Sequence, residues 1–342
     1  MKRLIWLMAL LLTLGLVLTG CQTSPSQSGI GEDTLRIGMV FDSAGAENPF
    51  FVRAQQGLER AREQFGDRIQ TQTSTPARDR ERIQMVQQFA EDGFDMVICV
   101  GSLFTHELPP VAQEFPDTHF VLLDNTIPDL TTASNISCVS FREQEGAFLT
   151  GAMAALVSDS KTIGFVGGMK IPPIERIEVG YRAGARYIDP DITVITEYIG
   201  YSGAAFNDPA AGKAMARKQL NQGADVIIQA AGTSGDGVIE AAAASGKLAI
   251  GLDIDQTLTA PEDQREYILT SLEKKMDEAV FLMVESLVAG TLKGGITELG
   301  LKEGCLGYSE NQYNQDLISD IKPEIEEIKA RIISGELTVP EK

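Results

Sequence analysis

The feature that most constrains the fold is a regular alternation of short apolar runs and helical patterns, which starts at Leu35. Runs such as LRIGMVF, FDMVICV and HFVLLD are nearly continuous in apolar residues, and segments with helical periodicity separate them. Strands of this kind are buried on both faces, because helices cover both sides of the sheet. The order therefore predicts an α/β protein with parallel sheets.

The second half of the chain repeats this rhythm, in runs such as TIGFVGG, ADVIIQAAG and KLAIGLD. The two halves together contain more strands than one open sheet usually holds, and the chain is long enough for two cores. We therefore expect two lobes, each built on its own parallel sheet.

The first residues predict export rather than a folded element. Lys2 and Arg3 precede a long apolar run, and the sequence turns polar directly after Cys21. This layout is typical of an export signal. The four residues LTGC at 18–21 resemble the lipobox of bacterial lipoproteins, in which the signal is cut before the cysteine and the thiol carries a lipid.

That resemblance implies a signal peptide at residues 1–20, followed by a lipidated Cys21 and a flexible tether over residues 21–34. The tether is rich in Ser, Gln, Gly and Pro, which are too polar to form a core. The protein would then lie outside the cytoplasm in the cell envelope, anchored to a membrane by its lipid. An ordinary signal peptide and an uncleaved membrane anchor are the alternatives.

The composition excludes several classes of partner. The chain has 29 basic and 48 acidic residues, a formal net charge of −19. Nucleic acids and anionic phospholipids require a basic surface, so neither is expected to bind. The two histidines and four cysteines show no spacing typical of zinc ligands, and no motif predicts a cofactor, so we expect neither a metal nor a cofactor.

The ends of the predicted strands give a candidate site. In open α/β sheets the ligand lies beyond the carboxyl ends of the strands, where small residues allow close approach and acids or amides orient the ligand. The strand ends in this sequence are Asp42 to Asn48, Gly101 to Phe104, Asp124-Asn125, Gly167 to Lys170, Gly232 to Asp236 and Asp253 to Asp255.

The sequence gives little support for a catalytic function. The sequence has no G-x-S-x-G motif, and GFVGGMKIPP lacks the Lys-Ser/Thr pair of a phosphate-binding loop. Acid pairs such as Asp253 and Asp255 suit proton transfer, but carboxylates also bind sugar hydroxyls. Phe206, in the loop YSGAAFNDPAAG, either stacks on a ligand ring or packs back onto the core. We therefore predict a binding protein rather than an enzyme.

Several long segments together resemble the basic membrane protein family, the substrate-binding lipoproteins of ABC importers for purine nucleosides. They include IGFVGGMKIPPIERIEVGYRAGARYIDPDI, GADVIIQAAGTSGDGVIEAA and AIGLDIDQ, and the resemblance covers essentially the whole chain after the signal. It implies a type I periplasmic-binding-protein fold, with two Rossmann-like lobes and a ligand cleft between them.

The family's three crossings between the lobes divide this chain into an N-terminal lobe and a C-terminal lobe. The crossings would fall near residues 140, 271 and 293. The N-terminal lobe then comprises residues 35–140 plus 272–292, and the C-terminal lobe comprises residues 141–271 plus 293–342.

The family's ligand roles transfer by position. The family clamps the purine between aromatic rings, which implies Phe206 as one ring. It binds the ribose hydroxyls with an acid and a lysine, which implies Asp253 in GLDIDQ and Lys274 in TSLEK. Gly232 would let the backbone approach the ligand, and the strand-end argument adds Asp42.

The first loop departs from the family pattern. The family usually reads Asp-Lys/Asn-Ser-Phe-Asn, followed by an aromatic residue shortly before a glycine. This chain has Glu47 and Asn48 in place of the acid and the amide, Phe51 in place of the second amide, and Gln55 in place of the aromatic residue. Glu47, Asn48 and Phe51 are therefore candidate ligand contacts, and the identity of the bound ring is the open question.

The predicted function is a monomeric, lipid-anchored receptor that closes around a small molecule, a purine nucleoside or related heterocycle, and delivers it to an ABC permease. One alternative is a sensor or signalling lipoprotein with the same cleft. A nucleoside-cleaving enzyme is the other alternative.

Overall fold

The computed structural model describes residues 34–42 and 48–342. The predicted signal peptide, Cys21, most of the tether and Glu47 lie outside the described residues. Within the described part, no helix is both long enough and apolar enough to cross a membrane.

The first lobe contains a six-stranded sheet with the strand order β11-β5-β4-β3-β1-β2. All of its neighbouring strands are parallel. The strands are β1 (Leu35–Phe41), β2 (Ile69–Ser74), β3 (Met96–Val100), β4 (His119–Leu123), β5 (Ile136–Phe141) and β11 (Gly295–Leu299). Every residue of β3 is buried, as expected of a central strand covered on both faces.

The second lobe contains a six-stranded sheet with the corresponding order β12-β10-β9-β8-β6-β7. Its strands are parallel except for β12, which runs antiparallel to β10 at the edge. The strands are β6 (Thr162–Met169), β7 (Thr193–Gly200), β8 (Val226–Ala230), β9 (Leu248–Asp253), β10 (Ile268–Lys274) and β12 (Leu306–Tyr308). The predicted fold class, two α/β lobes dominated by parallel strands, is confirmed.

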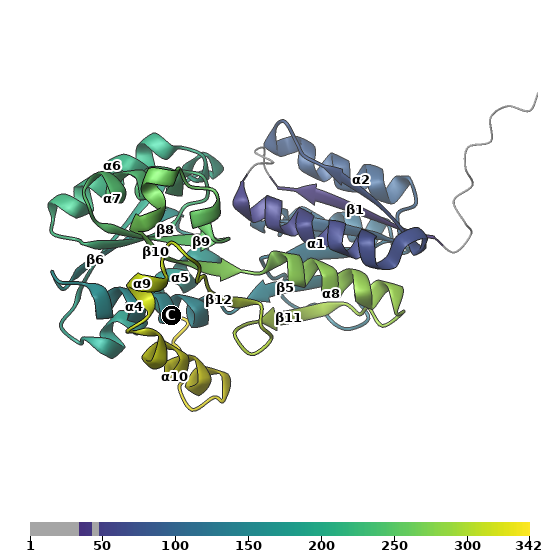
Figure 1. Cartoon of the computed structure of the whole chain (residues 1–342). Coiled ribbons are helices and arrows are strands. Elements are labelled where there is room, and N and C mark those ends of the chain that lie inside the picture. The colour runs from purple at the N-terminus through teal and green to yellow at the C-terminus, as the bar shows by residue number, and fades with distance from the viewer. Residues whose placement is uncertain (1–33, 43–47) are drawn as a thin grey trace, which may run out of the picture. The chain divides into compact units, whose positions relative to one another are not determined.

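Helices cover both sheets (Figure 1). They are α1 (Pro49–Phe65), α2 (Arg82–Glu91), α3 (Leu108–Glu114), α4 (Glu143–Val157), α5 (Pro172–Ile188), α6 (Pro209–Asn221), α7 (Ser234–Ala244), α8 (Met276–Val288), α9 (Gln315–Ile318) and α10 (Lys322–Ile333). Helix α8, green in Figure 1, lies beside the purple α1 although they are far apart in sequence. Their contact includes stacked rings of Phe65 and Phe281 with centroids 5.8 Å apart.

Helix α4 is largely buried because it packs against α5, against strands β10 and β12 of the second sheet and against α10. Helices α4 and α5 approach closely at Gly184, where a Cβ atom would lie 1.9 Å from the main-chain oxygen of Phe148. Only glycine permits this separation, so any substitution at Gly184 would force the helices apart.

The chain passes between the lobes three times, and the third crossing differs from the prediction. The first crossing joins β5 to α4, and the second joins β10 to α8. The sequence predicts that the first lobe ends at residue 292, but β11 pairs with β5 in the first sheet, which puts the third crossing after Leu299. The three central residues of β11, 296–298, are exposed and give no apolar run from which a strand could be predicted.

Candidate functional site

A cavity lies where the carboxyl ends of strands from both sheets meet. It encloses about 640 Å³ of empty space, which includes space open to solvent. Its lining consists of Asp42, Asn48, Phe50, Phe51, Gly101, Asp124, Ile171, Pro173, Ile174, Ile177, Phe206, Ala230, Gly232, Leu252, Asp253 and Lys274.

The two lobes contribute corresponding positions to this cavity. The third strands of the two halves, β3 and β8, are followed by Gly101 with φ 114° and Gly232 with φ 56°. The fourth strands, β4 and β9, lead to Asp124 with φ 72° and Asp253 with φ 68°. Positive φ is uncommon for residues other than glycine and is concentrated at functional sites. The shared strand order therefore places a paired set of unusual backbone turns around one cavity.

One half of the cavity is apolar and aromatic. The Phe206 ring lies against the backbone of Gly168, where a Cβ atom would be 2.4 Å from the ring. Phe51 is only 3 % exposed and stacks on Phe41, with ring centroids 4.6 Å apart. Phe50 is half-buried and meets Phe51 edge-on at 5.5 Å. Phe206 and Phe50 thus come from opposite lobes. Both side chains are more exposed than that of Phe51.

The other half of the cavity is charged, and Lys274 is at its centre. Its ammonium group forms ion pairs with Asp124 of the first lobe and, at 3.0 Å, with Glu143 of α4. The Glu143 side chain is fully buried, and its second oxygen accepts a hydrogen bond of 2.6 Å from Arg176 of α5. A buried carboxylate requires such partners, because desolvation alone would neutralise it.

These charges shift one another's pKa values. Burial raises the pKa of Asp124 to about 7, and the attraction of Lys274 only partly offsets this. Burial would also raise the pKa of Glu143, but Lys274 and Arg176 outweigh it and lower the pKa. Burial lowers the pKa of Lys274, and the neighbouring acids outweigh this effect and raise it. Lys274 and Glu143 are therefore charged at neutral pH, while Asp124 titrates close to neutrality.

Asp253 lies beside this group and is 6 % exposed. Across residues 34–42 and 48–342, neither of its carboxylate oxygens makes a hydrogen bond or an ion pair; only its main-chain oxygen accepts one, from Arg53. Burial raises the pKa of Asp253. A buried acid that lines a cavity without a hydrogen-bond donor is suited to accept one from a ligand.

Two polar residues of the first lobe complete the lining. Asp42 accepts a hydrogen bond of 3.2 Å from the main-chain nitrogen of Leu103, and its carboxylate occupies the space beside Gly101. Asn48 caps α1 by accepting a 3.1 Å hydrogen bond from the main-chain nitrogen of Phe50. Its amide nitrogen lies 3.3 Å from the position that a Cβ atom of Gly232 would occupy, so Asn48 reaches the second lobe.

The family of this chain follows from its match to known proteins. The family model described as "ABC transporter substrate-binding protein PnrA-like" matches residues 34–342. The chain belongs to this family of substrate-binding proteins. Basic membrane protein A of Borreliella burgdorferi is 29% identical over 339 residues, which cover 98% of this chain and 95% of the relative. An uncharacterised lipoprotein of Pyrococcus furiosus is 34% identical over 291 residues, covering 81% of this chain and 70% of the relative.

Solved structures agree with this assignment. A solute-binding protein of an ABC transporter system from Aeropyrum pernix superimposes with a TM-score of 0.78 at 28% identity, covering 90% of this chain and 94% of the other. Members of the family bind small-molecule solutes and work with an ABC transporter, and the family is one of binding proteins rather than enzymes.

The substrate-binding protein brings together almost all of the site residues that the sequence predicted. Asp42, Asn48, Phe51, Phe206, Gly232, Asp253 and Lys274 all line the cavity, and Glu47 lies outside the described residues. Gln55, at the family's aromatic position, is exposed and is not part of the lining.

Four features of the site were not predicted from the sequence. Asp124 appeared among the strand ends but was not chosen as a site residue. Phe50 was not assigned a ligand contact, and the apolar wall formed by Ile171, Ile174 and Ile177 has the ordinary pattern of a buried helix face. Glu143 gave no signal, because its partner Lys274 is 131 positions away in the sequence.

His119 is not arranged as a catalytic base. His119 Nε2 lies 2.7 Å from the Ser137 hydroxyl, but that hydroxyl donates to the main-chain oxygen of Lys293. The serine therefore accepts from the histidine, which is the reverse of what an activated nucleophile requires. His119 is the first residue of β4, at the opposite end of that strand from the cavity. Among the described residues, no cluster of side chains could hold a metal ion.

Proposed function

We propose that this protein captures a purine nucleoside, or a related heterocycle bearing hydroxyl groups, between its two lobes for delivery to an ABC permease. The observation that carries the proposal is the buried Asp253 carboxylate, which lines the cavity beside Lys274 without a hydrogen-bond donor in the described structure. A hydroxyl group of a ligand would supply the missing donor, and the Lys274 ammonium group would donate to a second ligand oxygen.

The two halves of the cavity match the two halves of a nucleoside. Phe50 and Phe206, from opposite lobes, offer rings on which a flat heterocycle stacks. The charged half suits a sugar, because carboxylates accept hydrogen bonds from hydroxyl groups. The described lining has one cation, Lys274, which already pairs with Asp124 and Glu143, so the cavity is poorly suited to a phosphate group.

The mechanism in this proposal is closure of the lobes around the ligand. Because the lining residues come from both sheets, a ligand in the cavity contacts both lobes at once. Such a ligand binds the closed arrangement more tightly than an open one and shifts the population toward it. A permease that recognises the closed arrangement would then receive only loaded protein.

The remaining parts of the proposal concern location and partners. Cys21 carries a lipid that anchors a monomeric receptor to a membrane of the cell envelope, outside the cytoplasm, from where the receptor delivers its ligand to an ABC permease. The residues between Cys21 and the first strand act as the tether. No bond is made or broken, and no cofactor takes part.

The test is direct binding to the purified protein without residues 1–21. Any small molecule that co-purifies is identified by mass spectrometry, and calorimetry then compares adenosine, guanosine, inosine and cytidine. The proposal expects a purine nucleoside to bind in preference to cytidine. If no nucleoside binds more tightly than about 100 μM, roughly −5.5 kcal/mol, the assignment of the ligand fails.

A further inference from the structure

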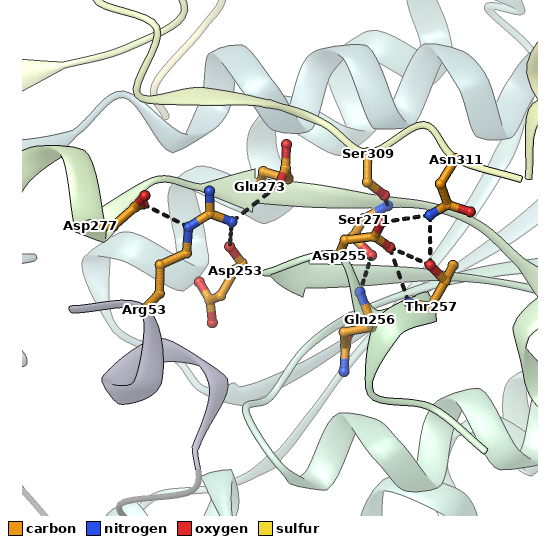
Figure 2. A network of polar contacts seen from close by, with 10 residues as sticks. All are labelled: Arg53, Asp253, Asp255, Gln256, Thr257, Ser271, Glu273, Asp277, Ser309 and Asn311. Atoms are coloured by element: carbon orange, nitrogen blue, oxygen red, sulfur yellow. Dashed lines mark hydrogen bonds and ion pairs between the residues drawn. The ribbon is translucent and has the colours of Figure 1, made fainter. Parts of the chain in front are cut away.

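Arg53, on the first helix of the first lobe, contacts the second lobe directly behind the proposed ligand site (Figure 2). Its Nη1 atom donates to the main-chain oxygen of Asp253 at 3.3 Å and to Glu273 at 3.1 Å. Its Nε atom donates to Asp277 of α8 at 2.8 Å. Asp253 and Glu273 belong to strands of the second sheet, so this one side chain bridges the lobes.

The Asp253 main chain has a rare conformation. Its φ is 68°, and the nitrogen of Ile254 donates to the oxygen of Leu252 at 2.9 Å, which closes a turn of three residues. A turn of this kind with positive φ at its centre is strained and requires support from its surroundings. The turn is also what directs the Asp253 side chain, because it fixes the backbone from which that side chain leaves.

The support comes from both lobes. Within the second lobe, the side-chain oxygen of Gln256 accepts a 3.0 Å hydrogen bond from the nitrogen of Leu252, at the start of the turn. From the first lobe, Arg53 donates to the oxygen of Asp253, at the centre of the turn. Figure 2 shows the guanidinium group of Arg53 next to that oxygen, with the Asp253 carboxylate directed away from it.

We infer that Arg53 is a positioning residue for ligand binding: it holds, from the opposite lobe, the strained turn that presents the Asp253 carboxylate to the cavity. The inference rests on the proposed function, because it takes Asp253 as a ligand contact. Arg53 itself does not touch the ligand in this scheme. Its contact with Asp253 makes the geometry of the site depend on the approach of the lobes.

The chemistry of arginine fits this role. A guanidinium group presents several donors in a fixed plane, so it can be anchored on one side and still donate on another. Asp277 and Glu273 provide the anchor, and the Arg53 side chain is only 14% exposed. The two hydrogens of Nη1 match its two acceptors, Glu273 and Asp253.

The chain offers a matched control for a purely structural salt bridge. Arg60 lies further along α1 and pairs with Glu278 of α8 at 2.9 Å, so it joins the same two helices. Within the described part of the chain, it forms no hydrogen bond with the turn at Asp253 and does not line the cavity. Loss of Arg60 should therefore lower stability without altering the site.

The first experiment is a double-mutant cycle on the soluble domain, measured by calorimetry with the tightest-binding purine nucleoside. Arg53→Met should weaken binding about tenfold, the effect of losing a hydrogen bond from a charged group. In an Asp253→Ala background the same change should weaken binding by less than about twofold, because the carboxylate that the turn presents to the ligand is absent. Arg53→Lys should restore part of the affinity, and Arg60→Met should leave it unchanged.

The second experiment needs no ligand and therefore separates this inference from the proposed function. Amide hydrogen exchange at Ile254 reports directly on the turn, because that amide closes it. Arg53→Met should speed exchange at Ile254 about tenfold more than Arg60→Met does. Equal exchange rates in the two variants would overturn the inference, as would a tenfold loss of affinity that persists in the Asp253→Ala background. If the native protein binds no nucleoside while the exchange result holds, the proposed ligand is wrong and the support of the turn by Arg53 stands.

Discussion

Replacing Lys274 by methionine tests the electrostatics of the site most directly. The change removes the one cation that lies between Asp124 and Glu143, and leaves both carboxyl groups buried. Removing one partner of a buried ion pair usually lowers the free energy of unfolding by about 3–5 kcal/mol, because the remaining charge is uncompensated. We expect a loss of this size at pH 8, although Arg176 continues to bind Glu143.

The loss should depend on pH, and the sign follows from Asp124. Its folded-state pKa is raised from 3.8 to about 7, so its contribution to stability is complete at low pH and is lost as the pH rises through about 7. In the variant, without Lys274, that pKa should rise further, so Asp124 stays protonated at pH 8. In the native protein Asp124 is ionised at pH 8, which is about one unit above its pKa. This ionisation limits the loss of stability in the native protein, and one pH unit corresponds to about 1.4 kcal/mol. At pH 5.5 Asp124 is protonated in both proteins, and the loss should be smaller by about that amount.

Urea unfolding of both proteins at pH 5.5 and pH 8 measures this difference. Lys322→Met is the control, because Lys322 forms a surface ion pair with Glu310 at 2.6 Å. Exposed pairs contribute about 0–1 kcal/mol, so the control should change little at either pH. A loss below about 1 kcal/mol for Lys274→Met at pH 8, or a loss that does not change with pH, would refute the reasoning.

Three further predictions concern the ligand and the anchor. Phe206→Ala and Asp253→Ala should each weaken nucleoside binding at least about tenfold, since one removes a stacking ring and the other a hydroxyl acceptor. Phe50→Ala should weaken binding about tenfold, whereas Gln55→Ala should leave it unchanged, because only Phe50 lines the cavity. Cys21→Ser should move the full-length protein from the membrane fraction to the soluble fraction, because the lipid has no attachment point.

Each of these three predictions has a result that would contradict it. Unchanged affinity in both Phe206→Ala and Asp253→Ala would show that the ligand binds elsewhere. A loss of affinity in Gln55→Ala as large as that in Phe50→Ala would mean that position 55, where the family has an aromatic residue, contacts the ligand. Retention of Cys21→Ser on the membrane would favour an uncleaved apolar anchor over a lipid.

Much of the fold was predictable because its signals are local. The apolar runs of β1, β3 and β8 mark strands that are buried on both faces, and their alternation with helices requires parallel sheets. The strand β11 was not predicted, because three of its five residues are exposed. It belongs to the first sheet through its pairing with β5, which its own sequence does not indicate.

Some features of the site could likewise be predicted from the sequence, and others could not. The sequence by itself determined which residues end the strands, and therefore that Asp42, Gly232 and Asp253 share one edge of their sheets. Only the tertiary structure decided which distant groups meet there. Glu143 reaches Lys274 across 131 positions, and Arg53 reaches the Asp253 backbone across 200. The physical reason is that the spacing of apolar residues indicates only how one segment is buried. The partner of a buried charge depends on how the two lobes bring their strand ends together.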